Sequence, residues 1–182
     1  NQGKCGACWA FATTGALESF YAIQNKLSGG SLKQFSEQEL VDCSRPQRNG
    51  GCDGGLMSYA YDYIIKNKIG NEEEYPYEGL SVNCRSQKTK TRFTLAEYNT
   101  LPEGSFNVEE LAKLIKTQPI AVAFEVLREL FDYKSGVYVP SYSCGNSLNH
   151  GVLAVGYNTL AAIASRRRPC SGSEAAKRRS SA

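Results

Sequence analysis

Two cysteines and one histidine carry side chains suited to covalent chemistry. Cys5 and Cys8 stand three positions apart in the segment KCGAC, and His150, the sequence's single histidine, follows Cys8 by 142 positions. Cysteines with this spacing fit a dithiol redox pair, half of a zinc site, or a reactive thiol beside a structural one. The seven cysteines are an odd number, so in an oxidising compartment one thiol stays free or pairs with another chain. A free thiolate is a strong nucleophile.

The zinc and redox interpretations each lack a required partner. A structural zinc site needs four clustered ligands, and the sequence has neither a second C-x-x-C pair nor a second histidine. A thioredoxin-like pair is expected after a strand in a βαβ unit, whereas Cys5 lies at the chain start with no predicted strand before it. We therefore expect no metal and no other cofactor. The redox interpretation would make the protein a dithiol oxidoreductase, and it holds only if Cys5 and Cys8 form a disulfide with each other, which mapping the disulfides would show.

A nucleophilic cysteine needs a base, an environment that favours thiolate, and hydrogen-bond donors for an oxyanion. Small and apolar residues recur at helical spacing after Cys8, so a helix beginning there would direct its positive N-terminal end at the sulfur. His150 is the only histidine available as the base. The pattern favours Cys8 as nucleophile and His150 as its proton-transfer partner.

The elements that must position these residues change character along the chain. Helices are expected after Cys8, after the capping-box sequence at Ser36, and over 56–67 and 107–118, with Pro119 ending the last one. Segments rich in β-branched or aromatic residues and bounded by glycine or proline predict strands at 119–125, 135–140 and 149–157. A helical first half followed by a β-rich second half predicts the α+β class, and a cleft between two such lobes is a natural ligand site.

Composition and charge exclude two classes of partner. With 182 residues, 41% of them hydrophobic and 21% charged, the chain can build a sizeable globular core. No apolar run approaches the ~18 residues of a membrane span. The net charge of +3 arises beyond position 158, where six basic residues and one acidic residue lie, so the rest of the chain is slightly acidic. We therefore expect neither a membrane nor a nucleic acid as partner.

The segment QGKCGACWAF resembles the active-site segment of papain-like cysteine proteases, the cathepsin group. Four further segments follow in that family's order: SEQELVDC at 36–43, GCDGGLM at 51–57, YPY at 75–77 and NHGVLAVGY at 149–157. The resemblance covers about residues 1–157 and is closest to the cathepsin L-like subgroup. It implies a two-lobe papain-like fold, with a helical lobe over 1–105 that carries the nucleophile and a partial, β-barrel-like lobe over 106–157 that carries the histidine.

The resemblance also implies roles for particular residues. Cys8 would be the nucleophile of a cysteine endopeptidase, His150 its ion-pair partner, and Gln2 an oxyanion donor alongside the Cys8 N–H. Trp9 would pack in the core behind the nucleophile. Disulfides would join Cys5 to Cys52 and Cys43 to Cys84, and Cys144 would pair with a distal cysteine. Substrate would contact Gly54 and Gly55 through their backbone, and a hydrophobic pocket for the side chain two residues before the cut (S2) would be lined by Leu56, Met57, Ala123, Leu148 and Gly151.

The same resemblance implies peptide or protein substrates, a propeptide or protein inhibitor as a further partner, a monomer, and a lysosomal or secreted location. The chain departs from the family after Tyr157, because no Asn-Ser-Trp motif occurs to supply the asparagine that orients the histidine. We expect the segment 158–182 to be a non-family, disordered tail and the chain to be an incomplete or frameshifted piece of such a protease. The alternative function is accordingly a catalytically inactive product that binds peptide or inhibitor without turnover.

Overall fold

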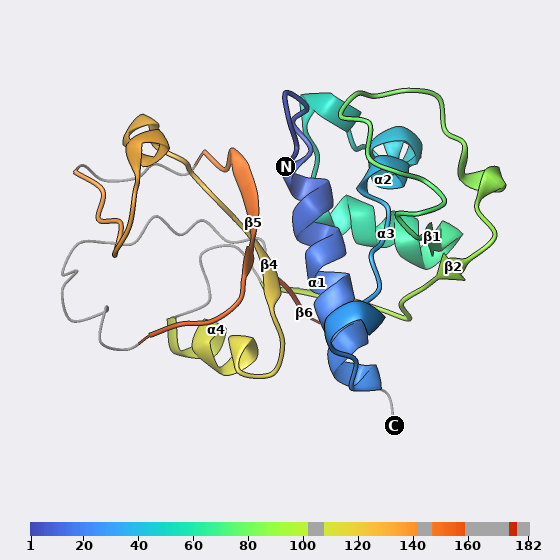
Figure 1. Ribbon diagram of the computed structural model, residues 1–182. Helices are drawn as coiled ribbons and strands as arrows, with labels where there is room; N and C mark the ends of the chain where they lie inside the picture. Colours follow the sequence, from blue (N-terminus) through green and yellow to red (C-terminus); the bar gives the residue numbers. More distant parts are fainter. Residues whose placement is uncertain (102–107, 142–146, 159–174, 178–182) are drawn as a thin grey trace.

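The long helix α1 (Cys8–Asn25) is the central element of the computed structural model, which describes residues 1–101, 108–141, 147–158 and 175–177. Figure 1 shows α1 between α2 (Glu37–Cys43) and α3 (Met57–Asn67) on one side and the strands β4 and β5 on the other. The predicted helical spacing after Cys8 is confirmed. The helix ends at Lys26, whose left-handed backbone (φ 53°) returns its N–H to the carbonyls of the last turn.

The helix α2 begins at the capping residue predicted from the sequence. Ser36 is the N-cap, and its Oγ accepts a hydrogen bond from the Glu39 N–H at 2.9 Å. The Glu39 side chain does not return to the cap; it is buried, accepts hydrogen bonds from Tyr63 Oη and the Gly70 N–H, and pairs with Arg92 at 2.8 Å. This network joins α2 to α3, to β1 (Ile69–Gly70) and to β2 (Arg92–Phe93).

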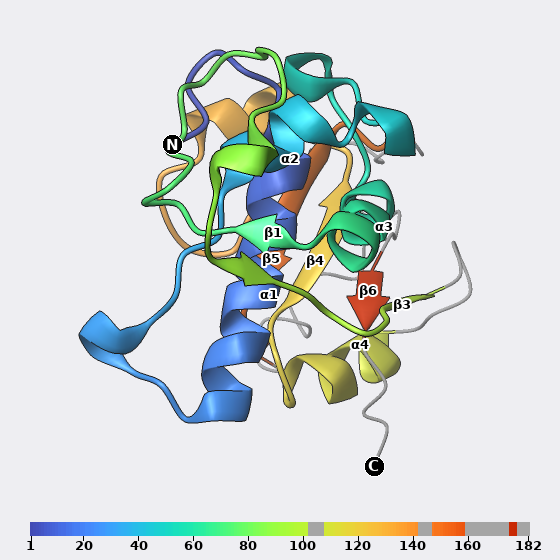
Figure 2. The same cartoon turned by 90° about the vertical axis from the view of Figure 1, so that its right-hand side faces the viewer.

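The β-rich part consists of β3 (Asn99–Leu101), β4 (Ile120–Phe124), β5 (His150–Ala154) and β6 (Ala175–Lys177), with α4 (Val108–Ile115) before β4. The pairs β1–β2, β3–β6 and β4–β5 are all antiparallel. Figure 2 shows β4 and β5 running along α1. The α+β class, the helix before Pro119 and the strands at β4 and β5 are confirmed.

Two expectations about the strands need correction. Residues 135–140 were expected as a strand and form none, because Gly136 turns the chain at φ 89° and its carbonyl accepts a hydrogen bond from Tyr133 Oη. The segment 158–182 was expected to lack regular structure, but Ala175–Lys177 forms β6 by pairing its backbone with β3. Positions 159–174 and 178–182 lie outside the described residues.

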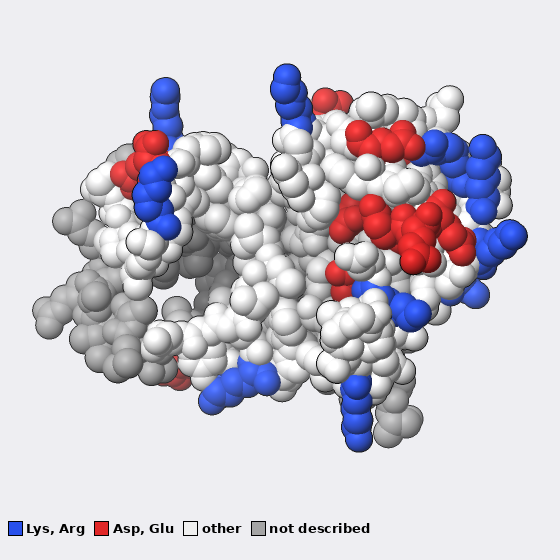
Figure 3. Space-filling model, viewed as in Figure 1, with Lys and Arg blue, Asp and Glu red and all other residues white. Residues whose placement is uncertain are grey.

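Charged side chains are unevenly spread over the surface. In Figure 3, acidic side chains gather over the helical half, whereas lysines and arginines are scattered around the rim. Within the described ranges, no helix has the length and apolar character needed to cross a membrane.

Candidate active site

The nucleophile candidate, Cys8, is the half-buried first residue of α1. Cys5 is joined to Cys52 by a disulfide, and the Gly6 N–H donates to the Cys52 carbonyl at 2.9 Å. A Cβ at Gly6 would lie only 2.6 Å from that carbonyl oxygen, so this position requires glycine. The Cys8 N–H meets no acceptor in the part of the chain that the structure describes. The helix therefore presents a free N–H and its positive end beside the sulfur.

Trp9 supports the wall of the site that is formed by the glycine segment at Gly54 and Gly55. Its ring is 1% exposed and donates through Nε1 to the Gly51 carbonyl at 3.3 Å. Gly55 passes directly over that ring, since a Cβ there would lie 2.8 Å from two of its carbon atoms. Asn49 fixes the same segment by accepting a hydrogen bond from the Leu56 N–H at 2.8 Å. Trp9 thus packs in the core, as expected, and holds up the glycine segment.

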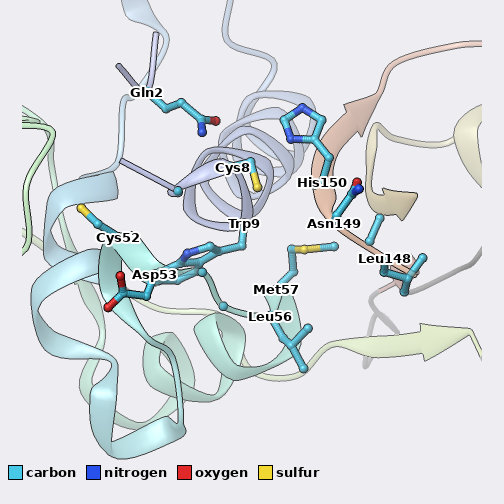
Figure 4. Close-up of a pocket in the computed structure, with 15 residues that line it drawn as sticks. Gln2, Cys8, Trp9, Cys52, Asp53, Leu56, Met57, Leu148, Asn149 and His150 are labelled. Carbon is cyan, nitrogen blue, oxygen red and sulfur yellow. The ribbon is translucent and has the colours of Figure 1, made fainter. Parts of the chain in front are cut away.

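The histidine approaches Cys8 from the other side of the cleft. His150 opens β5 and pairs with Phe124 of β4, whose ring it also contacts edge to face at a centroid distance of 5.9 Å. Gly151 is buried against the first turn of α1: a Cβ there would lie 3.4 Å from Trp9 Cα and 3.5 Å from the Cys8 carbonyl carbon. This close approach of β5 to α1 brings His150 beside Cys8 (Figure 4).

Gln2, in the segment before α1, is the third expected catalytic residue at this site, after Cys8 and His150. Its Nε2 donates to the Cys5 carbonyl at 3.0 Å, which uses one of the two amide hydrogens and leaves the other available. Its own carbonyl accepts a hydrogen bond from Tyr77 Oη at 2.8 Å. Figure 4 shows Cys8 between Gln2 and His150.

Gln2, Cys8 and His150 line one cavity of about 360 Å³. The cavity brings together the expected catalytic residues, Gln2, Cys8 and His150, and the expected substrate-binding residues, Gly54, Gly55, Leu56, Met57, Ala123, Leu148 and Gly151. Met57 and Ala123 are buried, whereas Leu56 at its rim is 39% exposed.

The family model described as "Papain family cysteine protease" matches residues 1–165. The chain belongs to this family. The match runs eight positions past Tyr157, where the resemblance was expected to end.

Curated papain-family relatives include "Cysteine proteinase 5" of Dictyostelium discoideum, 42% identical over 161 residues, and "Cathepsin L-like" of Caenorhabditis elegans, 44% identical over 162 residues. Each alignment covers 87% of this chain, but only 44% and 46% of the respective relative. The chain therefore spans less than half the length of these relatives.

Solved papain-family structures share the fold. The bromelain protease from Ananas comosus, in complex with the E64 inhibitor, superimposes with a TM-score of 0.76 at 34% identity, over 88% of this chain and 71% of that one. Digestive procathepsin L 3 of Tenebrio molitor gives a TM-score of 0.75 at 41% identity, over 87% of this chain and 51% of that one. The papain-like α+β fold is thus confirmed, in incomplete form.

The cysteine pairing settles the opening alternatives for this papain-family chain. The structure contains the Cys5–Cys52 and Cys43–Cys84 disulfides implied by the resemblance, and Cys8 is a free thiol. Cys5 is therefore unavailable to Cys8, which contradicts the dithiol oxidoreductase. Cys144 lies outside the described residues. No group of three or more metal-ligating side chains is present within the described ranges.

Sequence reasoning missed several residues of this papain-family site. Asn49 and Asp53 were not singled out, although the former fixes the Leu56 backbone and the latter lines the cavity. Asn149 was quoted only as part of a motif, yet its Oδ1 accepts a hydrogen bond from the Val126 N–H at 2.7 Å and ties β5 to the chain after β4. The position of Asn149 directly before the only histidine was the available signal.

Proposed function

We propose that this site is that of a cysteine endopeptidase. The observation that carries the proposal is the meeting of His150 with Cys8 and Gln2, which lie more than 140 positions earlier in the sequence, in one cavity. The free Cys8 N–H and the second Gln2 amide hydrogen are the two donors that an oxyanion between them would accept. This donor pair, next to a thiol and an imidazole, matches the requirements of acyl transfer.

The chemistry follows from these groups. The Cys8 thiolate attacks the peptide carbonyl carbon, and the carbonyl electron pair moves onto the oxygen held by Gln2 and the Cys8 N–H. The C–N bond then breaks as His150 gives its proton to the leaving nitrogen, which leaves a thioester on Cys8. Water attacks the thioester while His150 accepts its proton, and the restored thiolate departs.

Substrate would lie along the glycine segment and the apolar end of the cavity. No partner for the Gly55 N–H or carbonyl occurs among the described residues, so both can pair with an extended peptide. Met57, Ala123 and Leu148 give the adjacent wall an apolar surface, so we propose preference for a hydrophobic side chain two residues before the cut. An arginine buried there would find no counter-charge on that wall.

Turnover by this 182-residue chain is proposed to be slow, which keeps the inactive binding protein as the second candidate. The His150 ring and the Phe124 ring meet in a T-shaped contact, and no hydrogen-bond partner for the His150 nitrogens lies among the described residues. Misplacing a catalytic group by about 1 Å can reduce the rate by ~100-fold. Thioester formation from an activated ester is affected less, because its leaving group needs no proton from His150.

Two disulfides suit an oxidising compartment, so we propose the lysosome or secretion. The cavity would also accept a propeptide or protein inhibitor in place of substrate. Among similar structures, the Tenebrio protein is a procathepsin, which supports a propeptide as partner, and the bromelain is a complex with the E64 inhibitor, which supports an inhibitor in the cavity. We propose a monomer.

The test combines labelling with turnover on the full chain. At pH 5.5, iodoacetamide and an epoxide inhibitor are expected to modify Cys8 selectively, as located by mass spectrometry, and Cys8→Ser abolishes both reactions. Peptide substrates with Leu or Phe two residues before the cut should be cleaved faster than the matched Arg peptide. Selective labelling together with release of nitrophenol from an acylamino-acid nitrophenyl ester supports the peptidase. Labelling without any ester acylation supports the inactive binding protein.

A further inference from the structure

The segment that carries Gln2 is held in place by few contacts. The Gln2 backbone carbonyl accepts a hydrogen bond from the Cys5 N–H at 3.4 Å, a distance at the weak end of the hydrogen-bond range. It also accepts one from Tyr77 Oη at 2.8 Å, a distance typical of a strong hydrogen bond. The Gln2 side-chain amide makes a third hydrogen bond, to the Cys5 carbonyl. Of the contacts to the Gln2 backbone, the one from Tyr77 is therefore the shortest, and it comes from 75 positions away in the sequence.

Tyr77 is itself fixed relative to the nucleophile. Its ring meets Phe11 edge to face at a centroid distance of 4.9 Å, and Phe11 lies in α1 one turn after Cys8. The Tyr77 N–H donates to Glu72 Oε1 at 2.8 Å. Burial raises the pKa of Tyr77, and the negative charge of Glu37 raises it further, so the phenol stays protonated and able to donate. The hydroxyl is thus set at a fixed place with respect to the helix that carries the sulfur.

We propose that Tyr77 is a positioning residue for the oxyanion donor Gln2. Two anchors define the Gln2 amide: the Cys5 carbonyl orients the Nε2 end, and the Tyr77 hydroxyl holds the backbone end at a set distance from α1. The inference rests on the proposed function, because it needs an oxyanion for Gln2 to stabilise. Tyr77 does not line the cavity, so it acts through Gln2 and not through contact with substrate.

Loss of the hydroxyl in Tyr77→Phe keeps the ring contact with Phe11 and removes only the anchor of Gln2. Removing an oxyanion donor outright costs roughly 10²–10³ in rate, and a loosened donor should cost a fraction of that. We expect the rate constant for acylation of Cys8 by an acylamino-acid nitrophenyl ester to fall about 3–10-fold, in keeping with partial loss of that stabilisation. Tyr98→Phe is the matched control, because it also removes one hydroxyl, bonded to Asp62 at 2.9 Å, from a ring paired with another aromatic ring.

Two further measurements separate positioning from general damage. Alkylation of Cys8 by iodoacetamide forms the S–C bond as iodide leaves and develops no oxyanion, so Tyr77→Phe should change its rate less than twofold. In a double-mutant cycle, Tyr77→Phe should slow acylation in the parent chain but have no effect in the Gln2→Ala background, because no amide remains to be positioned.

The outcomes distinguish this inference from the proposed function. Slower acylation, unchanged alkylation and loss of the effect in the Gln2→Ala background support the positioning role. Equal slowing in both backgrounds, or slowing of alkylation by Tyr77→Phe, would overturn that role while leaving the peptidase intact. A parent chain that is alkylated at Cys8 but never acylated would overturn both, since no oxyanion would form.

Discussion

Three glutamates of the helical half, Glu18, Glu37 and Glu72, make the stability of this protein depend on pH. Each accepts a hydrogen bond from another residue: Glu18 from the Phe35 N–H at 2.8 Å, Glu37 from Thr14 Oγ1 at 2.7 Å and Glu72 from the Tyr77 N–H at 2.8 Å. Glu72 Oε2 is buried without an N–H or O–H donor among the described residues, and the Glu37 carboxyl lies beside it. A proton shared between these two carboxyls would satisfy that oxygen.

The pKa values reflect this crowding. Burial is the main cause that raises the pKa of Glu18 to about 7 and the pKa of Glu72 to about 7, and nearby carboxylate charge adds to both. Burial raises the pKa of Glu37 as well. In the unfolded chain these carboxyls titrate near 4.5, so between about pH 4.5 and 7 the folded state binds more protons. The contribution of these three carboxyls to the free energy of unfolding is therefore greatest at or below pH 4.5 and falls as the pH rises to 7.

The substitution Glu72→Gln tests this directly. Glutamine keeps the Oε1 acceptor for the Tyr77 N–H and offers an amide donor to Glu37, so no shared proton is needed. A shift of this size at a fully buried group would be worth about 3 kcal/mol, and partial exposure reduces it to about 1–2 kcal/mol. With a urea m-value of roughly 2 kcal/mol/M, the variant should unfold at about 0.5–1 M higher urea than the parent at pH 7.5, and at the same urea concentration at pH 4.5.

Fluorescence of Trp9, the only tryptophan and 1% exposed, reports the transition. The matched control is Glu73→Gln, which changes the exposed neighbour of Glu72 and should leave the pH dependence as it is in the parent. Equal pH dependence in the parent and Glu72→Gln would refute the assignment.

Two further substitutions probe the packing that supports the site. Gly151→Ala places a methyl group 3.3 Å from Met57 Sδ of α3 and 3.4 Å from Trp9 Cα of α1, so these neighbours must yield by a few tenths of an ångström. We expect a loss of about 1–3 kcal/mol in thermal unfolding, whereas Gly30→Ala, which meets no atom within 4 Å, should cost much less in the same assay. Glu39→Ala removes the buried carboxylate that pairs with Arg92 at 2.8 Å and accepts hydrogen bonds from Tyr63 Oη and the Gly70 N–H, and a loss of about 3–5 kcal/mol in urea unfolding is expected. A loss below 1 kcal/mol would show that the network does not hold α2 in place.

Local signals in the sequence were enough for the helices and the longer strands. Ser36 and Glu39 have capping-box spacing, and α2 begins where that spacing predicts. The pair formed by β1 and β2 could not be predicted, because two residues per strand carry no periodicity. The segment 135–140 has strand composition, but the turn at Gly136 and its bond from Tyr133 decide its path.

Some residues of the candidate site could also be predicted from the sequence alone, and others could not. Cys8 and His150 were accessible from residue chemistry alone, because the helix start and the single histidine are visible in the sequence. Gln2 entered only through the family resemblance, since an isolated glutamine carries no chemical signal. Its link to Tyr77 joins positions 75 apart, and no local pattern encodes such a contact.

The contact of Gly151 with the first turn of α1 has a consequence for how the protein folds. Both disulfides of the described residues lie within positions 5–84, so they organise the helical half without constraining β5. Bringing His150 to Cys8 then closes a loop that consists mainly of the stretch after Cys84, at an entropic cost of about 4 kcal/mol. We expect the β4–β5 hairpin to dock late, as contacts of such high sequence separation form slowly. A nascent or partly folded chain would hold its thiol apart from its base, so the onset of reactivity would report the completion of folding.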